Sequence, residues 1–599
     1  MCGVVGIFLN RPLRPDDVAL GRAMQAALKY RGPDAEGEWQ DQDAGVWLGH
    51  TRLAIQDLSA AASQPMLSSS HTALTYNGEI YNFPALRADL LQHGDHFVSD
   101  GDTEVLLHGW NRYGKAFLER IDGMFSFALW DGEQAWLAGD AFGEKTLYVA
   151  ETPDGIYACS ELAPLARLLE ADASLSGDLL CAFLALGYIP APQTARAGIR
   201  RLAPAGILQI KRGRIVAESS HWSLPVPQIG KGEPEPLTET ELDSLCDSLC
   251  TSLRGRLISD VPVSLFLSGG IDSGLIAALC AKELSTKLPC VTVRFSTDDG
   301  DECHTASAVA KHLGLPHQIV DSQSGNTSLD ADTLLGLFGQ PNDNLTVAAV
   351  HQMSTAATAL GYTVGLTGMG GDELLIGYQK ASFLWRYRHL FDMPWPLRKA
   401  LDPVFAAGAV FNSRAATARA LSRQPNWLRY LTIKNQPGNE LLRDISGFDS
   451  WASRNFGHSG PAWLEAAAFD AGSVMPSSQL PALDLGSMRA SLELRTPFLS
   501  RMLFEQVAKL DPRRLVSRGQ KEPLRRLLRR YLPESITSLP KRGFILPQSR
   551  FLAQHPGKTP EVPGVPAAVS TALWERRTEI GYERLAVRLA LAERYLANG

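Results

Sequence analysis

A proline-rich segment divides the chain into two parts that differ in their pattern of apolar residues. Residues 223–237 read SLPVPQIGKGEPEPL, with four prolines, two glycines and charges of both signs. Proline lacks the amide hydrogen that helices and sheets use, so this composition is typical of a linker. We therefore expect two folded domains, over residues 2–222 and 238–599, on either side of it. The total of 599 residues is long enough to bury more than one core.

Short apolar runs of strand length follow one another closely in the first domain. Turn residues separate them, and one stretch with helical spacing, residues 15–30, lies among them. Strands at such short spacing favour antiparallel pairing, so we expect an α+β domain built on antiparallel sheets. The expected strands are residues 2–9, 46–48, 53–55, 73–76, 125–130, 135–138, 147–150 and 156–159.

Strands and helices alternate in the second domain. This alternation predicts an α/β domain, in which crossover helices join the strands of a parallel sheet. From about residue 380 onward the spacing of apolar residues is mostly helical. The expected strands are residues 261–267, 290–295 and 363–367, and the expected helices are residues 242–257, 274–284 and 305–313.

Charge and composition exclude several classes of protein. Lys plus Arg total 58 and Asp plus Glu total 64, so the chain lacks the basic excess of a nucleic-acid binder. No apolar run approaches the roughly 20 residues of a membrane-spanning helix, and the first residues lack the pattern of a signal peptide. We therefore expect a cytoplasmic protein without nucleic-acid partners or membrane insertion. The eight cysteines form no Cys-x-x-Cys pair, which argues against a disulfide framework or a zinc ribbon.

Cys2 is the first candidate catalytic residue. Once Met1 is removed, Cys2 carries a thiol and a free α-amine, whose pKa of about 7.7–8.0 lets the amine act as a base for the thiol. Taken alone, a cysteine at this position is more often a small residue on an edge strand. Polar segments that follow at turn or strand positions change that interpretation: residues 50–55 (HTRLAI), 77–82 (NGEIYN) and 101–104 (GDTE).

The set resembles a class II glutamine amidotransferase, which is an N-terminal-nucleophile glutaminase domain built from stacked antiparallel sheets. The resemblance departs within residues 139–148 (GDAFGEKTLY), where Gly139 and Thr146 replace the Arg and Pro that the family usually has. We interpret this departure as a local change in the sheet near the domain interface. The resemblance rests on six segments in this order: residues 2–3 (CG), 6–7 (GI), 31–34 (RGPD), 50–55 (HTRLAI), 77–82 (NGEIYN) and 101–105 (GDTEV).

The resemblance implies a role for each candidate residue of this domain. The Cys2 thiolate would attack the amide carbon of glutamine, and the Asn77 side chain and the Gly78 N–H would hold the developing oxyanion. Taken singly, the charged residues nearby would more often be surface ion pairs. As an ordered set behind Cys2, they would bind the α-carboxylate and the α-ammonium of the substrate: Arg52 for the carboxylate, Glu79 and Asp102 for the ammonium.

A second candidate site lies between an expected strand and an expected helix of the second domain. Residues 267–273 read LSGGIDS, whose glycines allow close approach of the backbone and whose hydroxyl and N–H groups suit phosphate oxygens at a helix N-terminus. The segment lacks the Gly-Lys-Ser/Thr ending of a Walker loop. It resembles the PP-loop of ATP pyrophosphatases, which cleave ATP to AMP and pyrophosphate.

A second cluster of glycine and acidic residues, 366–373 (LTGMGGDE), supports that resemblance. Asp272 and Asp372 would be oxygen ligands of a Mg²⁺ ion that bridges the phosphates of ATP. Lys521 matches a catalytic lysine that the family places on the transferred phosphates, although the arginines after it would also fit a solvated basic helix. The resemblance assigns nine residues to ATP binding: Leu267, Ser268, Gly269, Gly270, Asp272, Ser273, Val293, Thr367 and Gly368.

The two halves in this order resemble the glutamine-hydrolysing asparagine synthetases, over roughly residues 2–550. The resemblance implies that ATP activates a carboxylate as an acyl-adenylate, which ammonia then attacks after passing through an internal channel. Aspartate would be the acceptor, and the products would be asparagine, AMP, pyrophosphate and glutamate. The resemblance also allows a homodimer. Further segments of the family pattern stand near the end of that span: residues 487–488, 491–493, 495, 497–499, 518–521 and 541–544.

Three positions depart from a typical asparagine synthetase. Met369 stands where the family commonly carries an acid, or a tyrosine in its β-lactam-forming relatives. Gln340 begins a segment (QPNDN) that often reads Asp-Glu-Pro, and Ser500 replaces an Asp. Because Met369 offers neither a base nor a charge, a different acceptor stays open: a uronic acid of a surface polysaccharide, or a peptide or natural-product acid. A regulatory protein without activity is the non-enzymatic alternative, and the intact candidate residues argue against it.

Overall fold

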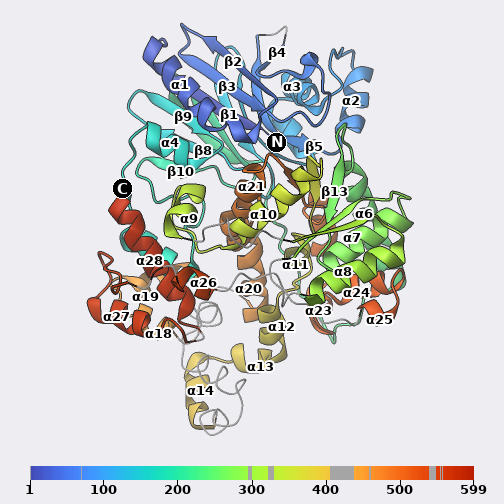
Figure 1. Ribbon diagram of the computed structural model, residues 1–599, viewed down its shortest axis with the longest axis vertical. Helices are drawn as coiled ribbons and strands as arrows, with labels where there is room; N and C mark the ends of the chain where they lie inside the picture. The colour runs from blue at the N-terminus through green and yellow to red at the C-terminus, as the bar shows by residue number, and fades with distance from the viewer. Residues whose placement is uncertain are drawn as a thin grey trace.

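The computed structural model describes residues 2–598 except 69–70, 295–299, 322–329, 405–437, 457–459, 538–547, 554, 556 and 580. The N-terminal strands lie at the top of Figure 1, and the parallel sheet and most of the helices lie beneath them. Residue 295, the end of an expected strand, and the segment 541–544 lie outside the described residues. Within the described residues, none of the helices is both long and apolar enough to cross a membrane.

Two antiparallel sheets form the first part of the chain, as the sequence predicts. In the described residues the first sheet has the order β10 (Ile199–Arg201), β8 (Tyr148–Glu151), β9 (Gly155–Cys159), β1 (Gly3–Leu9), β3 (Val46–Arg52) and β2 (Ala35–Asp41). The second has the order β12 (Arg214–Ser220), β11 (Gly206–Lys211), β7 (Ala135–Gly139), β6 (Gly123–Trp130), β5 (Ala73–Ile80) and β4 (Met66–Leu67). The α-helices of this part are α1 (Pro15–Ala27), α2 (Phe83–Gln92), α3 (Asp102–Tyr113), α4 (Leu162–Leu168) and α5 (Gly177–Leu186).

The two sheets stack face to face, with helices on their outer faces. Side chains alternate along β1, so Val4 and Phe8 enter the core between the sheets. Val5 and Ile7 point the other way, into a second cluster with residues of α1 and α4. Residues of α2 and α3 cover the outer face of β5 and β6 in the same manner. The first residues of β1, next to Cys2, are therefore fixed from both sides.

A parallel sheet with crossover helices forms the centre of the second part, again as predicted. Its order in the described residues is β15 (His317–Asp321), β14 (Cys290–Arg294), β13 (Val263–Phe266), β16 (Val364–Leu366) and β17 (Glu493–Arg495). The helices around the sheet are α6 (Glu239–Arg256), α7 (Ile271–Lys282), α8 (Gly300–Leu313), α9 (Ala331–Phe338), α10 (Thr346–Ala359) and α11 (Gly371–Leu374).

The rest of the chain is mostly helical, which confirms the expectation from apolar spacing. One stretch, Asp470–Gln479, is a π-helix that contains Pro476. The elements are α12 (Gln379–Arg386), α13 (Arg388–Phe391), α14 (Trp395–Ala400), α18 (Asn439–Leu442), α19 (Phe448–Asn455), α20 (Ala462–Phe469), α21 (Leu480–Met488), α22 (Arg501–Ala508), α23 (Arg513–Val516), α24 (Glu522–Arg529), α25 (Glu534–Thr537), α26 (Gln548–Ala553), α27 (Ala567–Glu575) and α28 (Glu583–Asn598).

One expected strand is wrong, because residues 53–55 lie outside every strand. Strand β3 ends at Arg52, and the next backbone groups bind elsewhere: Ala54 N donates to Asp34 Oδ2, and Ile55 O accepts from Asp260 N. The apolar side chains of Leu53 and Ile55 pack against the second part of the chain. Their apolar character therefore reflects an interface between the two parts and not a strand.

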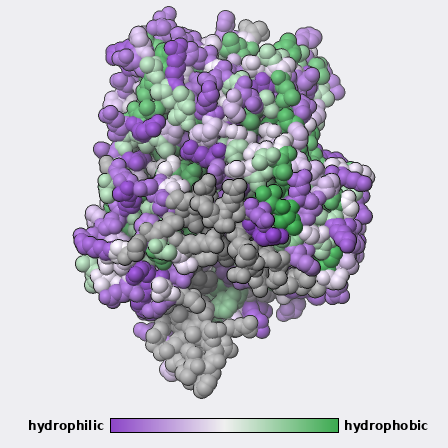
Figure 2. Space-filling view, viewed as in Figure 1, coloured by the Kyte–Doolittle hydropathy of each residue, from purple (hydrophilic) through white to green (hydrophobic). Residues whose placement is uncertain are grey.

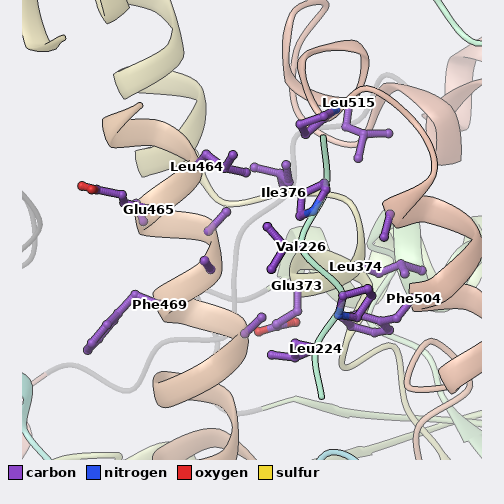
Figure 3. Close-up of a pocket in the computed structure, with 18 of the residues that line it drawn as sticks. Leu224, Val226, Glu373, Leu374, Ile376, Leu464, Glu465, Phe469, Phe504 and Leu515 are labelled. Carbon is purple, nitrogen blue, oxygen red and sulfur yellow. The ribbon is translucent and has the colours of Figure 1, made fainter. Parts of the chain in front are cut away.

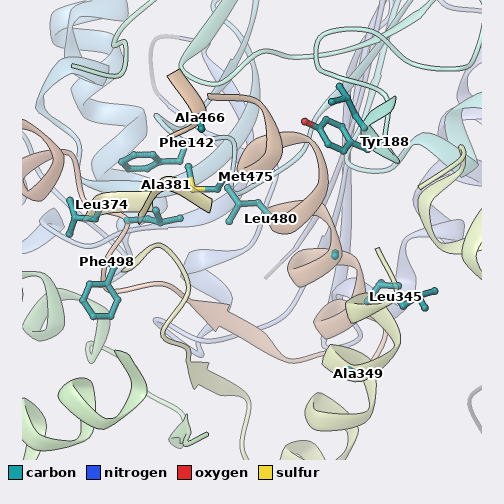
Figure 4. Packing of buried hydrophobic residues seen from close by; sticks show 14 of the residues in the cluster. Phe142, Tyr188, Leu345, Ala349, Leu374, Ala381, Ala466, Met475, Leu480 and Phe498 are labelled. Carbon is teal, nitrogen blue, oxygen red and sulfur yellow. The ribbon is translucent and has the colours of Figure 1, made fainter. Parts of the chain in front are cut away.

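The two parts share one large hydrophobic core. Phe142 and Tyr188 of the first part belong to it together with Met475 and Leu480 of the second part, which lie between them in Figure 4. Helix α5 contributes seven consecutive buried residues to the same core. On the face that Figure 2 shows, the coloured hydrophobic residues form separate small areas among hydrophilic ones. The largest apolar cluster thus spans both parts, although the boundaries 222 and 238 stay a prediction.

The C-terminal helix α28 is tied to this junction by a buried arginine. Arg588 donates from Nε to Asp343 Oδ2 at 2.7 Å and from Nη1 to the carbonyl oxygens of Leu184 at 2.7 Å and Ala185 at 3.0 Å. Its side chain is fully buried, and only 10% of the Asp343 side chain is exposed. The last residues, whose sequence is uninformative, therefore close the contact between α5 and the second part.

We expect Arg588→Met to destabilise the protein strongly. The substitution leaves the Asp343 carboxylate buried without its cation, which costs about 3–5 kcal/mol of the free energy of unfolding. The measurement is the thermal unfolding midpoint. Arg594→Met on the same helix is the matched control, because its ion pair with Asp332 is half exposed and contributes little. Equal midpoints for the two variants would contradict this account of the junction.

Candidate active sites

Cys2 lies directly before β1, buried against β5. Its backbone N–H donates to Asn77 Oδ1 at 2.8 Å, and its carbonyl oxygen accepts from Arg31 Nε at 3.0 Å. The Asn77 amide is therefore held by its oxygen. Its Nδ2 is buried and has no hydrogen-bond partner among the described residues. A buried donor without a partner is costly, so this nitrogen is ready for an oxygen that a ligand brings.

The Cys2 thiol needs a base. Burial raises the pKa of the thiol above its usual value, although nearby Arg52 lowers it in part. A neutral thiol is a weak nucleophile, so a proton acceptor has to take its proton before it attacks. The α-amine of Cys2, once Met1 is removed, is bonded to the same residue and can fill that role.

Arg52 holds a positive charge close to Cys2. It ends strand β3, donates from Nη1 to the carbonyl oxygen of Ser59 at 3.0 Å, and donates from Nη2 to that of Asp57. Within the described part of the chain it forms no ion pair with a carboxylate. Its guanidinium is thus oriented by neutral partners and keeps its charge for an anionic group.

Glu79 and Asp102 are both buried, and the charge of each raises the cost of ionising the other. Asp102 begins α3, and its Oδ2 accepts from Tyr76 Oη and from Ile80 N, both at 2.8 Å. Burial outweighs these donors and raises the pKa of Asp102 to about 6. Burial also raises the pKa of Glu79, and Arg495 opposes the rise. The predicted ammonium-binding carboxylates therefore lie next to each other.

Sequence reasoning missed several partners of this site. Tyr76 precedes Asn77 on β5, and its hydroxyl group gave no signal of a bond to Asp102. Arg31 stands in the RGPD segment, yet nothing local shows that it reaches Cys2. Gln56 donates to Glu79 from a loop. Arg495, in the segment SLELR, approaches Glu79 from the other part of the chain.

The predicted phosphate loop connects β13 to α7. Gly269 has φ +69, a left-handed conformation, and a Cβ there would lie 2.8 Å from Ala306 N, so only glycine fits. The Ser268 and Ser273 hydroxyls are 3.1 Å apart, and Ser268 Oγ accepts from Gly270 N at 3.3 Å. The loop thus brings two hydroxyl groups to the N-terminus of a twelve-residue helix, where anions bind favourably.

Lys521 joins the two predicted metal-binding carboxylates. Its Nζ lies 2.5 Å from Asp272 Oδ2 and 2.8 Å from Asp372 Oδ1. Its side chain is 3% exposed, so it does not belong to the solvated face of α24. Burial alone would lower the pKa of Lys521, but the two carboxylates outweigh burial and hold it above its usual value. At φ +52 the residue is also in a strained backbone conformation, which is common at functional sites.

This donor set fits Mg²⁺ bound together with ATP. Magnesium is typically held in such sites by one or two carboxylates plus phosphate oxygens and waters, and Asp272 and Asp372 supply the carboxylates. The described residues contain no group of three or more metal-ligating side chains, so a cage made by protein alone is absent from them. Lys521 stands between the carboxylates, where it neutralises them and would face a phosphate.

The other predicted nucleotide contacts lie near this loop. Leu267 N donates to Val291 O at 3.0 Å, and Val293 stands two residues further along the neighbouring strand β14. Thr367 N donates to Arg495 O at 3.0 Å. A Cβ on Gly368 would lie 2.8 Å from Asp272 Cβ, which brings the second glycine cluster directly against the first.

The three departing positions have separate environments. Met369 packs beside an apolar cluster around Phe266 and Leu494, so no charge replaces the usual acid there. Gln340 Oε1 accepts from Ala195 N at 3.0 Å, and Ser500 Oγ lies 3.5 Å from Asp122 Oδ2. Gln340 and Ser500 therefore make contacts with the first part of the chain.

A cavity of about 550 Å³ lies on one side of α11. Leu224 and Val226 of the expected linker lie between the helix that carries Leu464 and Phe469 and the one that carries Phe504 (Figure 3). Its lining is mainly apolar, and none of the described residues that line it is basic. Glu373, the residue after Asp372, also lines it; it accepts a hydrogen bond from Tyr378 Oη, and burial raises its pKa to about 7.

We expect glutamine binding to weaken as the pH falls through about 6. Asp102 attracts the α-ammonium only as a carboxylate, and its raised pKa of about 6 means that protonation begins at higher pH than for an ordinary aspartate. The measurement is the KM for glutamine between pH 5 and pH 8, from glutamate release. Asp102→Asn should raise the KM and remove this pH step. A step of the same size in that variant would contradict the assignment.

We expect Gly377→Ala to weaken Mg·ATP binding. A Cβ at this position would lie 2.5 Å from both Asp372 Oδ1 and Lys521 Cε, so it would push apart the pair that faces the phosphates. Overpacking of this kind costs about 1–3 kcal/mol, which would correspond to about fivefold to 150-fold in Kd. Calorimetric titration with Mg·ATP measures it. Gly274→Ala is the matched control, because its Cβ meets only Leu528 at 3.8 Å. Equal Kd values would contradict the prediction.

Comparison with known proteins covers both halves of the chain. The family described as glutamine amidotransferase domain matches residues 1–222, and the family described as asparagine synthase matches residues 244–556. A putative glutamine-hydrolysing asparagine synthetase of Mycobacterium tuberculosis is 29% identical over 92% of this chain and 88% of its own length. Asparagine synthetase 1 of Bacillus subtilis is 28% identical with the same coverage. The amidase chry2 of Gibberella zeae is 26% identical over 63% of this chain and 59% of its own.

Proposed function

The chain belongs to the asparagine synthase family of glutamine-hydrolysing, ATP-using carbon–nitrogen ligases, and we propose that it transfers the amide nitrogen of glutamine to a carboxylate activated as an acyl-adenylate. One observation carries the proposal: a chain with a buried Cys2 beside an unpartnered Asn77 Nδ2 also holds Lys521 between two carboxylates at a phosphate loop. Residues 2–222 would be the glutaminase domain, 223–237 the linker and 238–599 the synthetase domain.

In the glutaminase domain, Cys2 is the nucleophile. Its proton passes to its own α-amine, and the thiolate sulfur attacks the amide carbon of glutamine. Asn77 Nδ2 and the Gly78 N–H stabilise the oxyanion, which is worth several kcal/mol in a preorganised site. The C–N bond breaks, the amine returns the proton, and ammonia leaves. Water then hydrolyses the thioester to glutamate and restores the thiol.

Three charged residues position glutamine for this attack. Arg52 binds the α-carboxylate, since its guanidinium has only carbonyl partners within the described residues. Glu79 and Asp102 bind the α-ammonium, and their mutual repulsion in a buried site falls when a cation arrives. The raised pKa of Asp102 is the expected property of a carboxylate that waits for such a cation.

In the synthetase domain, ATP lies on the loop from Leu267 to Ser273. A carboxylate oxygen of the acceptor attacks the α-phosphorus, and pyrophosphate leaves. Lys521 stabilises the charge that develops on the leaving phosphates, and Gly368 with Val293 and Thr367 contacts the adenylate. Asp272 and Asp372 would hold Mg²⁺, which would supply positive charge to neutralise the phosphates. Ammonia then attacks the acyl carbon, and AMP leaves with formation of the amide.

The route for ammonia runs through the apolar cluster between the two domains. Tyr81, Leu53 and Met124 of the first domain pack there against Val364 and Met488 of the second. An apolar passage excludes water, and ammonia kept from water stays unprotonated and nucleophilic. The cluster begins next to Arg52 in sequence and ends at strand β16, which leads into Thr367.

Aspartate is the acceptor that the family name suggests, and the product would be asparagine. A second candidate is a carboxylic acid with an apolar body, which the mainly apolar cavity beside Glu373 favours. The described residues that line this cavity include no basic side chain that could pair with the α-carboxylate of aspartate. Met369, packed among apolar residues, points to the same candidate. Sugar, peptide and natural-product acids differ in how well they fit that cavity.

The test uses the purified protein with amide-¹⁵N glutamine, Mg·ATP and aspartate. Labelled asparagine with an equal amount of AMP, measured by mass spectrometry, would establish aspartate as the acceptor. Labelled ammonia and glutamate without asparagine would leave the glutaminase half in place and direct the search to acids with an apolar body. No release of glutamate from glutamine would contradict the proposed function.

We expect Cys2→Ala to abolish glutamine-dependent synthesis and to spare ammonia-dependent synthesis. Loss of the nucleophile removes the glutaminase reaction by about 10³-fold or more, while ammonium chloride at pH 8 supplies the same ammonia directly. AMP formation with each nitrogen source is the measurement. If both activities fell together, the two half-reactions would not be separate in the way proposed.

A further inference from the structure

Arg495 of the synthetase part reaches the predicted glutamine site. It ends β17, the edge strand of the parallel sheet, and its side chain is fully buried. Nε donates to Glu493 Oε1 at 2.7 Å, and Nη1 donates to the carbonyl oxygens of Arg256 at 2.8 Å and Ile258 at 2.6 Å. These three hydrogen bonds fix the plane of the guanidinium. They use Nε and Nη1, and the third nitrogen, Nη2, takes no part in them.

Nη2 faces Glu79 across the boundary between the two parts. The distance from Arg495 Nη2 to Glu79 Oε2 is 3.3 Å, and Nη2 makes no hydrogen bond of its own among the described residues. Glu79 sits on β5, and Gln56 Nε2 donates to the same oxygen, Oε2, that faces Arg495. The two charged side chains come from separate sheets that share no strand.

Glu79 needs this cation. Burial raises the pKa of Glu79 well above its usual value, and the negative charges of Glu493 and Asp102 add to this rise, which Arg495 opposes. A carboxyl group that becomes neutral attracts an α-ammonium group far less than a carboxylate does. Arg495 is the positive side chain that opposes these effects, and buried acceptors hold it in place: two carbonyl oxygens and the Glu493 carboxylate.

The same residue also contacts the second glycine cluster, residues 366–373. The carbonyl oxygen of Arg495 accepts from Thr367 N at 3.0 Å, and β17 pairs with β16 in register Leu366 to Arg495. The backbone of Arg495 thus binds a predicted adenylate contact, Thr367, and its side chain faces a predicted glutamine ligand, Glu79.

We propose that Arg495 is a positioning residue of the glutamine site, through which the synthetase domain orients the Glu79 side chain for the α-ammonium of glutamine and places a positive charge beside it. The inference rests on the proposed function, because it takes Glu79 as a ligand of glutamine. Removal of the guanidinium leaves Glu79 among other acids, and glutamine then binds more weakly. The nucleophile and the oxyanion donors do not change, so the loss falls on KM and less on kcat.

The experiment measures glutamate release from glutamine, which needs no knowledge of the acceptor. Arg495→Met should raise the KM for glutamine by about tenfold, within the usual range of coupling between sites, and change kcat by less than about threefold. Arg495→Lys keeps the charge and should recover part of the KM. Arg256→Met is the matched control: Arg256 is equally buried and bonds to carbonyl oxygens of the same region, but it makes no contact with Glu79.

A double-mutant cycle with Glu79→Gln separates positioning from general damage. If Arg495 acts through Glu79, substitution of Arg495 in the Glu79→Gln background adds little to the KM. Additive effects, or an equal rise in KM for Arg256→Met, would overturn the proposal. If Arg495→Met fails to fold, as judged by its unfolding midpoint and Mg·ATP binding, the same cycle with Arg495→Lys decides. Absence of glutamate release by the wild-type protein would instead contradict the proposed function.

Discussion

Arg31 is the side chain on which the geometry between the two parts depends. It is fully buried, and its three nitrogens bind the carbonyl oxygen of Cys2, the carboxylate of Glu161 and the carboxylate of Asp484 on α21. Lys145 adds a second cation at 3.4 Å from Asp484. Loss of any member would leave an uncompensated buried charge, which costs far more than an intact pair contributes. The position of Cys2, the proposed nucleophile, is therefore set by the second part of the chain as well as by its own sheet.

Both candidate sites contain local features that cost free energy, and these features differ between the two sites. The Asn77 Nδ2 donor is buried and unpaired among the described residues, and the carboxyl groups of Asp102 and Glu79 are buried close enough for their charges to repel each other. At the other site, Lys521 takes a left-handed backbone conformation to stand between two carboxylates. Such costs persist only where the surrounding structure over-determines the local geometry. The large shared core, with α5 and α28 closing it, supplies that rigidity.

The sequence predicts those features that depend on neighbours along the chain. The apolar residues of β1 and the strand, glycine loop and helix around Gly269 can be recognised from the local sequence. The structure contains both features. Strand β2, whose side chains are polar and partly exposed, and the three-residue strand β17 give no apolar pattern to detect. Residues 53–55 are apolar because they pack at the interface between the two parts, and this apolar pattern resembles that of a strand. The partners of Glu79 and Cys2 come from distant parts of the chain, and only the folded chain brings them together.

In the proposed mechanism, the residues that activate the carboxylate and the residues near the acceptor have different surroundings. The activation chemistry and the acceptor could therefore vary independently. Lys521, Asp272 and Asp372 form one face of the second glycine cluster, where crowding at Gly368 and Gly377 leaves no room for change. Met369 and Glu373 lie in the same short segment but face other surroundings, an apolar cluster and an apolar cavity. A substitution at Met369 would therefore change the apolar cluster without moving Lys521, Asp272 and Asp372. If the proposed roles hold, charge constrains the activation of a carboxylate in this chain, whereas shape and apolar contact constrain the choice of carboxylate.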